Sequence, residues 1–174
     1  MWNAVVKISA VYETAVIAEI ASLADEIWHE YYRGLFSKDQ IDYMLDLLQS
    51  ERAISKAIAN DQYTYYAIWD EDLLVGYCGV QPSDKYKALF LSNIYLRADY
   101  RGRKIGRLVF AMLTERCVSE GYASILLAVN KGNERSIKIF QKLGFVMERE
   151  ALTEIGNGYA LNNYIMRCPV RTAE

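Results

Sequence analysis

The stretch from Leu89 to Leu113 constrains the fold most, because a strand, a basic glycine-containing turn and a helix follow one another there. Residues Leu89–Leu96 alternate in character, which predicts a largely buried β-strand. After the link Arg97–Tyr100 come Arg101-Gly102-Arg103-Lys104-Ile105-Gly106, and then apolar residues at helical spacing: Leu108, Val109, Met112 and Leu113. Such a turn presents unpaired backbone N–H groups at the positive end of a helix dipole, which suits phosphate. A plain strand-to-helix turn with exposed basic side chains is the alternative interpretation.

Composition limits the class of protein. The chain has 174 residues, of which 52% are hydrophobic, and this predicts a single domain over residues 1–174. The formal net charge of -2 argues against a nucleic-acid partner. No apolar run approaches the ~20 residues of a membrane span, and Met1–Lys7 does not resemble a signal peptide. The three cysteines, Cys78, Cys117 and Cys168, lie far apart in apolar sequence, so we expect buried free thiols and hence a cytoplasmic location. Because the chain has one histidine and no Cys-x-x-Cys, we expect no metal site.

Periodicity and turn residues predict the other elements. Helices are expected at Thr14–Tyr31, from Ser37, at Ser50–Asn60, and from Asn133 with a buried face of Ile137, Phe140 and Leu143. Strands are expected at Val5–Ala10, Tyr63–Trp69, Leu73–Val80, Tyr122–Val129, Phe145–Leu152 and Tyr159–Arg167, with a loop at Gln81–Lys85. Summarised as β-α-α-β-β-β-α-β-α-β-β, this predicts an α/β (α+β) fold with a mixed, mostly antiparallel sheet of about seven strands flanked by helices.

Two motifs on these elements resemble signatures of the GNAT superfamily of acyl-CoA-dependent N-acetyltransferases, and the resemblance covers nearly the whole chain. The turn from Arg101 to Gly106 resembles the family's pyrophosphate loop, Arg/Gln-x-x-Gly-x-Gly/Ala, with Lys104 in place of the central glycine. The segment Asn133–Phe145 is similar to Asn-x-x-(Ala/Ser)-x-x-x-Tyr-x-x-x-Gly-Phe, with Phe140 in place of tyrosine. The turn has neither the Gly-x-Gly-x-x-Gly spacing of a Rossmann site nor the Gly-Lys-Ser/Thr of a P-loop.

The resemblance implies acetyl-CoA as the cofactor. Backbone N–H groups of the loop would hold the pyrophosphate, and the pantetheine arm would lie along Leu89–Leu96, where this strand splays from Tyr122–Val129. A positive φ at Lys104 would store strain of order 1 kcal/mol, because that position would favour glycine. Asn133 would bond the cofactor, and it also suits a helix N-cap. The implied cofactor-binding residues are Ile94, Tyr95, Leu96, Arg101, Gly102, Arg103, Lys104, Ile105, Gly106, Arg107, Asn133 and Phe140.

The implied reaction is direct attack of a primary amine, on a small molecule or peptide, in a ternary complex. The resemblance assigns oxyanion stabilisation to the backbone N–H of Leu96. An alkyl amine is about 0.1% neutral at pH 7, so a base would help. Glu30 or His29, at the end of the first helix, could be that base or simply exposed helix-end residues. Phe140 cannot donate a proton to the departing thiolate and is expected to pack in the core, so the candidate acids are water and two tyrosines, Tyr95 and Tyr164.

An acceptor pocket is expected between the first two helices and the last hairpin. Its candidate lining residues are Trp28, Tyr31, Tyr32, Tyr43, Tyr159 and Tyr164, some of which could be ordinary core aromatics. If they converge, they suit a cationic acceptor through cation–π contact, to which Glu30 and Asp42 would add. A non-catalytic CoA-binding sensor or interaction module of the same fold is the alternative function. The identity of the amine and the formation of a homodimer stay open.

Overall fold

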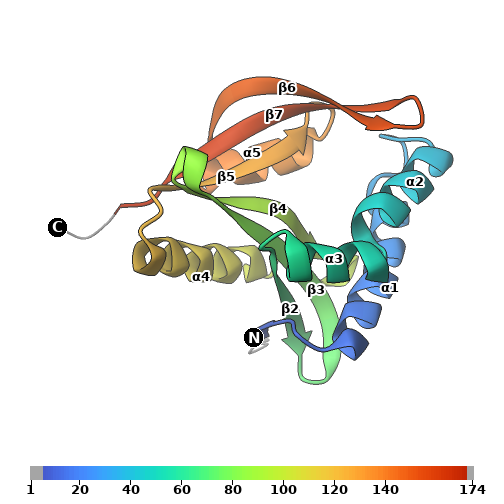
Figure 1. Ribbon diagram of the computed structural model, residues 1–174, viewed down its shortest axis with the longest axis horizontal. Coiled ribbons are helices and arrows are strands. Elements are labelled where there is room, and N and C mark those ends of the chain that lie inside the picture. Colours follow the sequence, from blue (N-terminus) through green and yellow to red (C-terminus); the bar gives the residue numbers. More distant parts are fainter. Residues whose placement is uncertain (1–5, 172–174) are drawn as a thin grey trace. The chain divides into compact units, whose positions relative to one another are not determined.

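The computed structural model describes residues 6–171. Its seven strands are hydrogen-bonded in the order β1-β2-β3-β4-β5-β7-β6. The pairs β1–β2, β2–β3, β5–β7 and β6–β7 are antiparallel and β4–β5 is parallel, which confirms the predicted mixed sheet. The elements in Figure 1 are β1 (Lys7–Ala10), α1 (Thr14–Tyr31), α2 (Lys38–Gln49), α3 (Glu51–Asn60), β2 (Thr64–Asp70), β3 (Leu73–Ser83), η1 (Asp84–Tyr86), β4 (Ala88–Leu96), η2 (Ala98–Tyr100), α4 (Ile105–Glu120), β5 (Ser124–Asn130), α5 (Glu134–Lys142), β6 (Val146–Gly156) and β7 (Tyr159–Pro169).

Two features of the predicted order need correction. The summarised order counts two helices between the first two strands, whereas the structure has three. The helix missing from that order is α3, which was expected at Ser50–Asn60 and is confirmed: the side chain of Ser50 caps it by accepting the N–H of Ala53 at 3.2 Å. The loop expected at Gln81–Lys85 is in part strand, since β3 continues to Ser83. Pro82 is tolerated because the pairing of β3 with β2 ends at Val80, so its missing N–H breaks no bond of that ladder. Val5, the expected start of β1, lies outside the described residues.

The described residues divide into two compact units, each of which is considered by itself. Residues 6–81 and 93–109 form the first, in which α1, α2 and α3 pack together (Figure 1). The apolar face of α1 is buried and contributes about 2 kcal/mol for each large aliphatic side chain. On α2, Leu48 is 39% exposed, whereas the neighbouring polar residue Gln49 is only 3% exposed and is therefore buried. The single-domain description of residues 1–174 stays a prediction.

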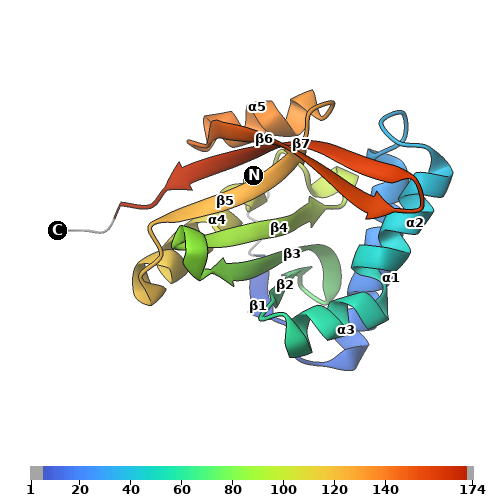
Figure 2. The same ribbon diagram turned by 45° about the horizontal axis from the view of Figure 1, so that its top comes forward.

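Residues 82–92 and 110–171 form the second unit. There β4 pairs with β5 from Ala88–Ser124 to Leu91–Leu127, and β7 lies between β5 and β6. Figure 2 shows β6 and β7 as a long hairpin. The predicted buried face of α5 is only half-buried, because that helix covers the unit from outside. One buried cluster of this unit consists of Ala88, Leu126 and Ile165, with Phe90, Ala128 and Ala151 packed against it.

The burial of the cysteines and the absence of an apolar membrane span were both expected from composition. Cys78 and Cys117 are buried free thiols as expected, whereas Cys168 is only half-buried. Within residues 6–171, none of the helices combines the length and apolar character needed to cross a membrane.

Candidate functional site

The predicted anion loop lies in the first unit, between η2 and α4. The backbone N–H of Arg101 donates to Ala98 O at 3.3 Å and that of Arg107 to Lys104 O at 3.0 Å. Between them, and considering only acceptors on the described backbone, four N–H groups have no partner: those of Gly102, Lys104, Ile105 and Gly106. A Cβ added at Gly102 or Gly106 would meet no atom within 4 Å. The loop therefore offers open backbone donors at a helix N-terminus, which fits a phosphate group.

The side chains of this loop have different roles from its backbone. Ile105 is only 3% exposed, so its side chain anchors α4 in the core and only its backbone N–H can face a ligand. The guanidinium of Arg103 lies 4.6 Å from the centroid of the Tyr100 ring. Arg107 and Lys104 are exposed and add positive charge. The sequence predicted this combination of backbone N–H donors with basic side chains around them.

Lys104 has a φ of 64°, so the position that is glycine in the family pattern has the left-handed conformation here. We expect Lys104→Gly to raise the free energy of unfolding by about 1 kcal/mol, because it relieves strain of that order. Equilibrium denaturation in urea measures the change. Arg107→Gly is the control: it places glycine in ordinary helix and should lower stability by about 1 kcal/mol. Equal losses in both variants would contradict strain at Lys104.

Arg101 was expected near the pyrophosphate, but its guanidinium contacts other groups. It donates to both carboxylate oxygens of Glu30, at 3.2 and 2.7 Å, and its Nε donates to Leu96 O at 3.0 Å. The same group lies 5.1 Å from the centroid of the Tyr31 ring. The side chain thus links the end of α1 to the end of β4, and only the backbone of Arg101 belongs to the loop.

Glu30, a candidate base, is engaged by this contact. Its two oxygens accept from one cationic guanidinium, and removing a proton from an amine would require it to give up part of that interaction. The geometry therefore favours a structural role for Glu30.

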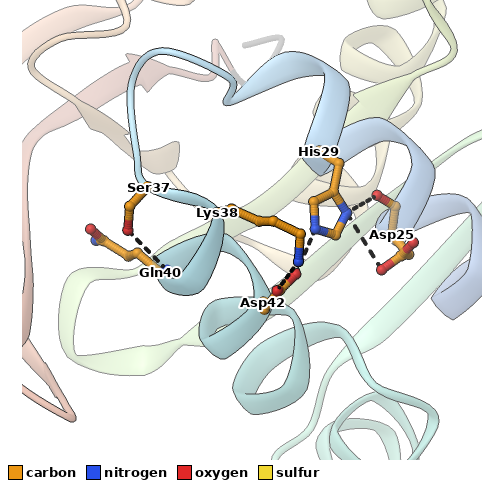
Figure 3. Close-up of polar contacts among 6 residues, drawn as sticks. All are labelled: Asp25, His29, Ser37, Lys38, Gln40 and Asp42. Atoms are coloured by element: carbon orange, nitrogen blue, oxygen red, sulfur yellow. Dashed lines mark hydrogen bonds and ion pairs between the residues drawn. The ribbon is translucent and has the colours of Figure 1, made fainter.

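His29, the other candidate base, belongs to an ion-pair cluster between α1 and α2 (Figure 3). Its Nδ1 lies 2.8 Å from Asp25 O and its Nε2 lies 2.6 Å from Asp42 Oδ1. Lys38 Nζ lies 2.6 Å from the other oxygen of Asp42. The bond to the Asp25 carbonyl and then the bond to Asp42 raise the pKa of His29, and Lys38 followed by His29 lowers the pKa of Asp42. An imidazolium satisfies both acceptors, so His29 is a poor base near neutral pH.

This cluster predicts how stability depends on pH. Because the pKa of His29 is raised above 6.5 in the folded state, its contribution is complete below pH 6.5 and is lost as pH rises through the folded pKa. The pKa of Asp42 is lowered, so its contribution is present above pH 3.8 and is lost as pH falls through the lowered pKa. The chain has one histidine, so NMR titration of its ring proton measures the first value directly. A midpoint at or below 6.5, or an equal pH dependence in His29→Gln, would contradict this cluster.

The aromatic residues at the end of α1 separate into core and surface. Trp28 is 4% exposed and its Nε1 donates to the Tyr77 hydroxyl at 3.2 Å, so this candidate pocket residue packs in the core. Tyr31 and Tyr32 are half-buried. The hydroxyls of Tyr32 and Tyr95 lie 2.8 Å apart. Burial raises the pKa of Tyr32 to about 12 and that of Tyr95 well above its ordinary value, so both phenols stay protonated at neutral pH.

Sequence reasoning did not find a polar network under α2. Gln49 Nε2 donates to Asn93 Oδ1 at 3.0 Å, and Asn93 Nδ2 lies 3.4 Å from the Tyr65 hydroxyl. Gln49 is 3% exposed and Asn93 is 7% exposed. A polar residue in an apolar strand was visible at Asn93, but its partner is on a helix far away in the sequence. This network fixes β4 against α2 close to Ile94, whose own side chain is half-buried.

The other predicted site residues lie in the second unit. Asn133 caps α5 by accepting the N–H of Ser136 at 3.2 Å, which confirms the capping prediction and leaves its cofactor role a prediction. The Phe140 ring is half-buried and packs against Phe145, with centroids 5.8 Å apart, so the expected core packing holds only in part. Lys131 Nζ lies 5.3 Å from the centroid of the half-buried Tyr164 ring. Tyr159, also half-buried, begins β7.

Comparisons with known proteins agree with this fold and show the family. The model of the acetyltransferase (GNAT) family matches residues 20–145. Over 82 residues the chain is 30% identical to the uncharacterized N-acetyltransferase YobR of Bacillus subtilis. This match covers 47% of this chain and 32% of that protein. Over 60 residues it is 30% identical to thialysine N-epsilon-acetyltransferase of Bos taurus, covering 34% of this chain and 35% of that one. The matches therefore span about a third of these relatives.

One solved structure with the same fold is the PaiA N-acetyltransferase of Thermoplasma acidophilum in complex with coenzyme A. It superposes with a TM-score of 0.77 at 18% identity, covering 94% of this chain and 98% of that one. This superposition shows that the two proteins share a fold. The family model matches more than half of this chain, so the chain belongs to the acetyltransferase (GNAT) family.

Proposed function

We propose that this protein is an acetyl-CoA-dependent N-acetyltransferase that acts on a primary amine of a small molecule or peptide. The observation that carries the proposal is the row of open backbone N–H groups at the N-terminus of α4, flanked by Gly102 and Gly106. Family membership supports an acyl-CoA as the ligand of this loop. A complex with coenzyme A is known for the PaiA structure of the same fold.

The chemistry divides between the cofactor and the chain. Bound acetyl-CoA supplies the acetyl group as an activated thioester. The backbone donors of Gly102, Lys104, Ile105 and Gly106 would hold its phosphates and so orient it. The N–H of Leu96 is the proposed donor to the developing negative charge.

Proton transfer is assigned to groups that have the right protonation state. Since the geometry engages Glu30 and His29 in ion pairs, a water chain is the better route for the proton of the amine. Tyr95, on β4, is one proposed acid: burial raises its pKa, so the phenol is protonated at neutral pH but gives up its proton less readily than an exposed tyrosine. Tyr164 on β7 stays the other proposed acid.

The acceptor is proposed to be a small amine bound near Tyr31 and Tyr32, at the end of α1. The lining role of Tyr159, at the start of β7, stays a prediction. The name of the thialysine N-epsilon-acetyltransferase relative specifies a small amine as acceptor. Half-buried aromatic rings suit such a cation. A cytoplasmic location and a homodimer stay predictions.

Calorimetry followed by thiol detection tests the function. We expect CoA to bind, and acetyl-CoA with a panel of amines to release thiol well above the rate of solvent hydrolysis. The absence of CoA binding at millimolar ligand would contradict the whole proposal. Binding without turnover would instead favour a CoA-binding sensor or interaction module, which the packed Phe140 and the engaged Glu30 also support.

A further inference from the structure

Two arginine–glutamate pairs connect α1 to the end of β4 and the residues after it, all within the first unit. Glu26 and Glu30 are one helical turn apart on α1, and their partners Arg97 and Arg101 have the same spacing. Arg97 Nη1 lies 2.6 Å from Glu26 Oε1, and Arg101 Nη2 lies 2.7 Å from Glu30 Oε2.

The two arginines hold different carbonyl groups. Nε of Arg97 donates to Leu74 O at 3.0 Å, on β3. Nε of Arg101 donates to Leu96 O at 3.0 Å, on the last residue of β4. Of the two side chains, only that of Arg101 therefore contacts the residue whose N–H is the proposed oxyanion donor. The backbone N–H of Arg97, in the same peptide unit as the Leu96 carbonyl, also donates to Val75 O at 2.9 Å.

The planar guanidinium of Arg101 makes this arrangement possible. One edge binds Glu30 through two parallel hydrogen bonds while Nε remains directed at Leu96. The side chain of Arg101 is 17% exposed and that of Glu30 is 52% exposed, so the guanidinium is largely shielded while the carboxylate stays open to water. The paired geometry, with two charge-assisted bonds to one carboxylate, is what favours this contact. A lysine donates from one nitrogen and cannot reproduce the planar fork that binds both oxygens of Glu30 while a separate nitrogen binds Leu96 O.

We propose that Arg101 is a positioning residue for acetyl transfer, and that Glu30 acts through it. Glu30 orients the guanidinium, and the guanidinium holds the Leu96 carbonyl. The peptide unit of this carbonyl meets the unit that carries the Leu96 N–H at the Leu96 Cα, so holding the carbonyl restricts rotation about Leu96 and with it the direction of that N–H. This deepens the proposed acetyltransferase function and rests on it. It differs from a role of the Arg101 side chain in phosphate binding and from a role of Glu30 as a base.

Steady-state kinetics of Glu30→Gln, with Glu26→Gln as the matched control, tests the proposal. Both changes remove one carboxylate charge from α1, but only the first loosens the hold on Leu96. We expect kcat to fall about tenfold in Glu30→Gln, because a small misplacement of a reacting group costs rates of this order. We expect kcat in Glu26→Gln to change by less than about twofold. Equal losses in the two variants would overturn the proposal.

Three further readouts separate the alternative roles. Arg101→Lys should lower kcat while leaving the Kd of CoA, measured by calorimetry, within about twofold; a loss of CoA affinity of about tenfold or more would assign the side chain to phosphate binding. In Glu30→Gln the pH–rate profile should keep its shape, whereas loss of its acid limb would make Glu30 the base. The double variant Glu30→Gln/Arg101→Lys should lower kcat little more than either change alone; fully additive losses would overturn the proposal.

A structural readout distinguishes failure of this proposal from failure of the proposed function. Amide hydrogen exchange at Ile94–Arg97 should accelerate in Glu30→Gln relative to wild type and to Glu26→Gln. If the wild-type protein does not turn over but exchange still accelerates in Glu30→Gln, the proposed enzyme activity is refuted and the hold on Leu96 is supported. Unchanged exchange would overturn the hold itself.

Discussion

Replacing Gly76 by alanine is expected to lower the free energy of unfolding by about 2–3 kcal/mol. A Cβ at this position would lie 2.5 Å from Tyr95 O and 2.6 Å from Leu96 Cδ2. The first of these is a backbone atom of β4, so it can move only if the strand moves. Urea denaturation measures the loss. Because Tyr95 and Leu96 are proposed site residues, thiol release with acetyl-CoA and an amine should fall in the same variant.

Gly79→Ala, on the same strand, is the matched control. Its Cβ would lie 3.1 Å from Asn93 Nδ2 and from Tyr65 Cζ, which are side-chain atoms that can shift by a few tenths of an ångström. We expect a loss of about 1 kcal/mol or less. If Gly79→Ala costs as much as Gly76→Ala, the close approach of Gly76 to the Tyr95 carbonyl does not explain the effect.

Gly106→Ala is expected to weaken CoA binding by at least about tenfold, or 1.4 kcal/mol, while making the protein more stable. The added Cβ meets no protein atom within 4 Å, and alanine in a helix is favoured over glycine by about 0.5–1 kcal/mol. The same Cβ would project into the open space beside the loop donors, where the pyrophosphate is proposed to lie. Calorimetry with CoA and urea denaturation measure the two opposite changes.

Ala111→Gly provides the reverse control, because Ala111 is exposed on the same helix and lies outside the loop. We expect a stability loss of about 1 kcal/mol with unchanged CoA affinity. If Gly106→Ala binds CoA as well as wild type does, the cofactor does not approach this glycine, and the anion-loop interpretation is wrong.

The sequence alone determined the features that depend on neighbours a few residues apart. Helix α1 begins and ends at the predicted residues, Thr14 and Tyr31. Ser37 and Asn133 cap α2 and α5 by accepting N–H groups three residues ahead. The strand–turn–helix unit around Gly106 was predictable because strand alternation, a basic glycine turn and helical spacing are all local patterns.

Tertiary structure decided what the candidate site residues contact. Glu30 and Arg101 are 71 residues apart in the chain, and Trp28 and Tyr77 are 49 apart. From local sequence, Glu30 could be a base or an exposed helix-end residue, and Trp28 could line a pocket or pack in the core. Only the fold placed Glu30 in an ion pair and Trp28 in the core. The sign of φ at Lys104 could not be predicted either, because the residues next to a lysine in the sequence do not determine its backbone conformation. A side chain's chemistry is fixed by its identity, but its role is fixed by partners that the chain brings to it from far away.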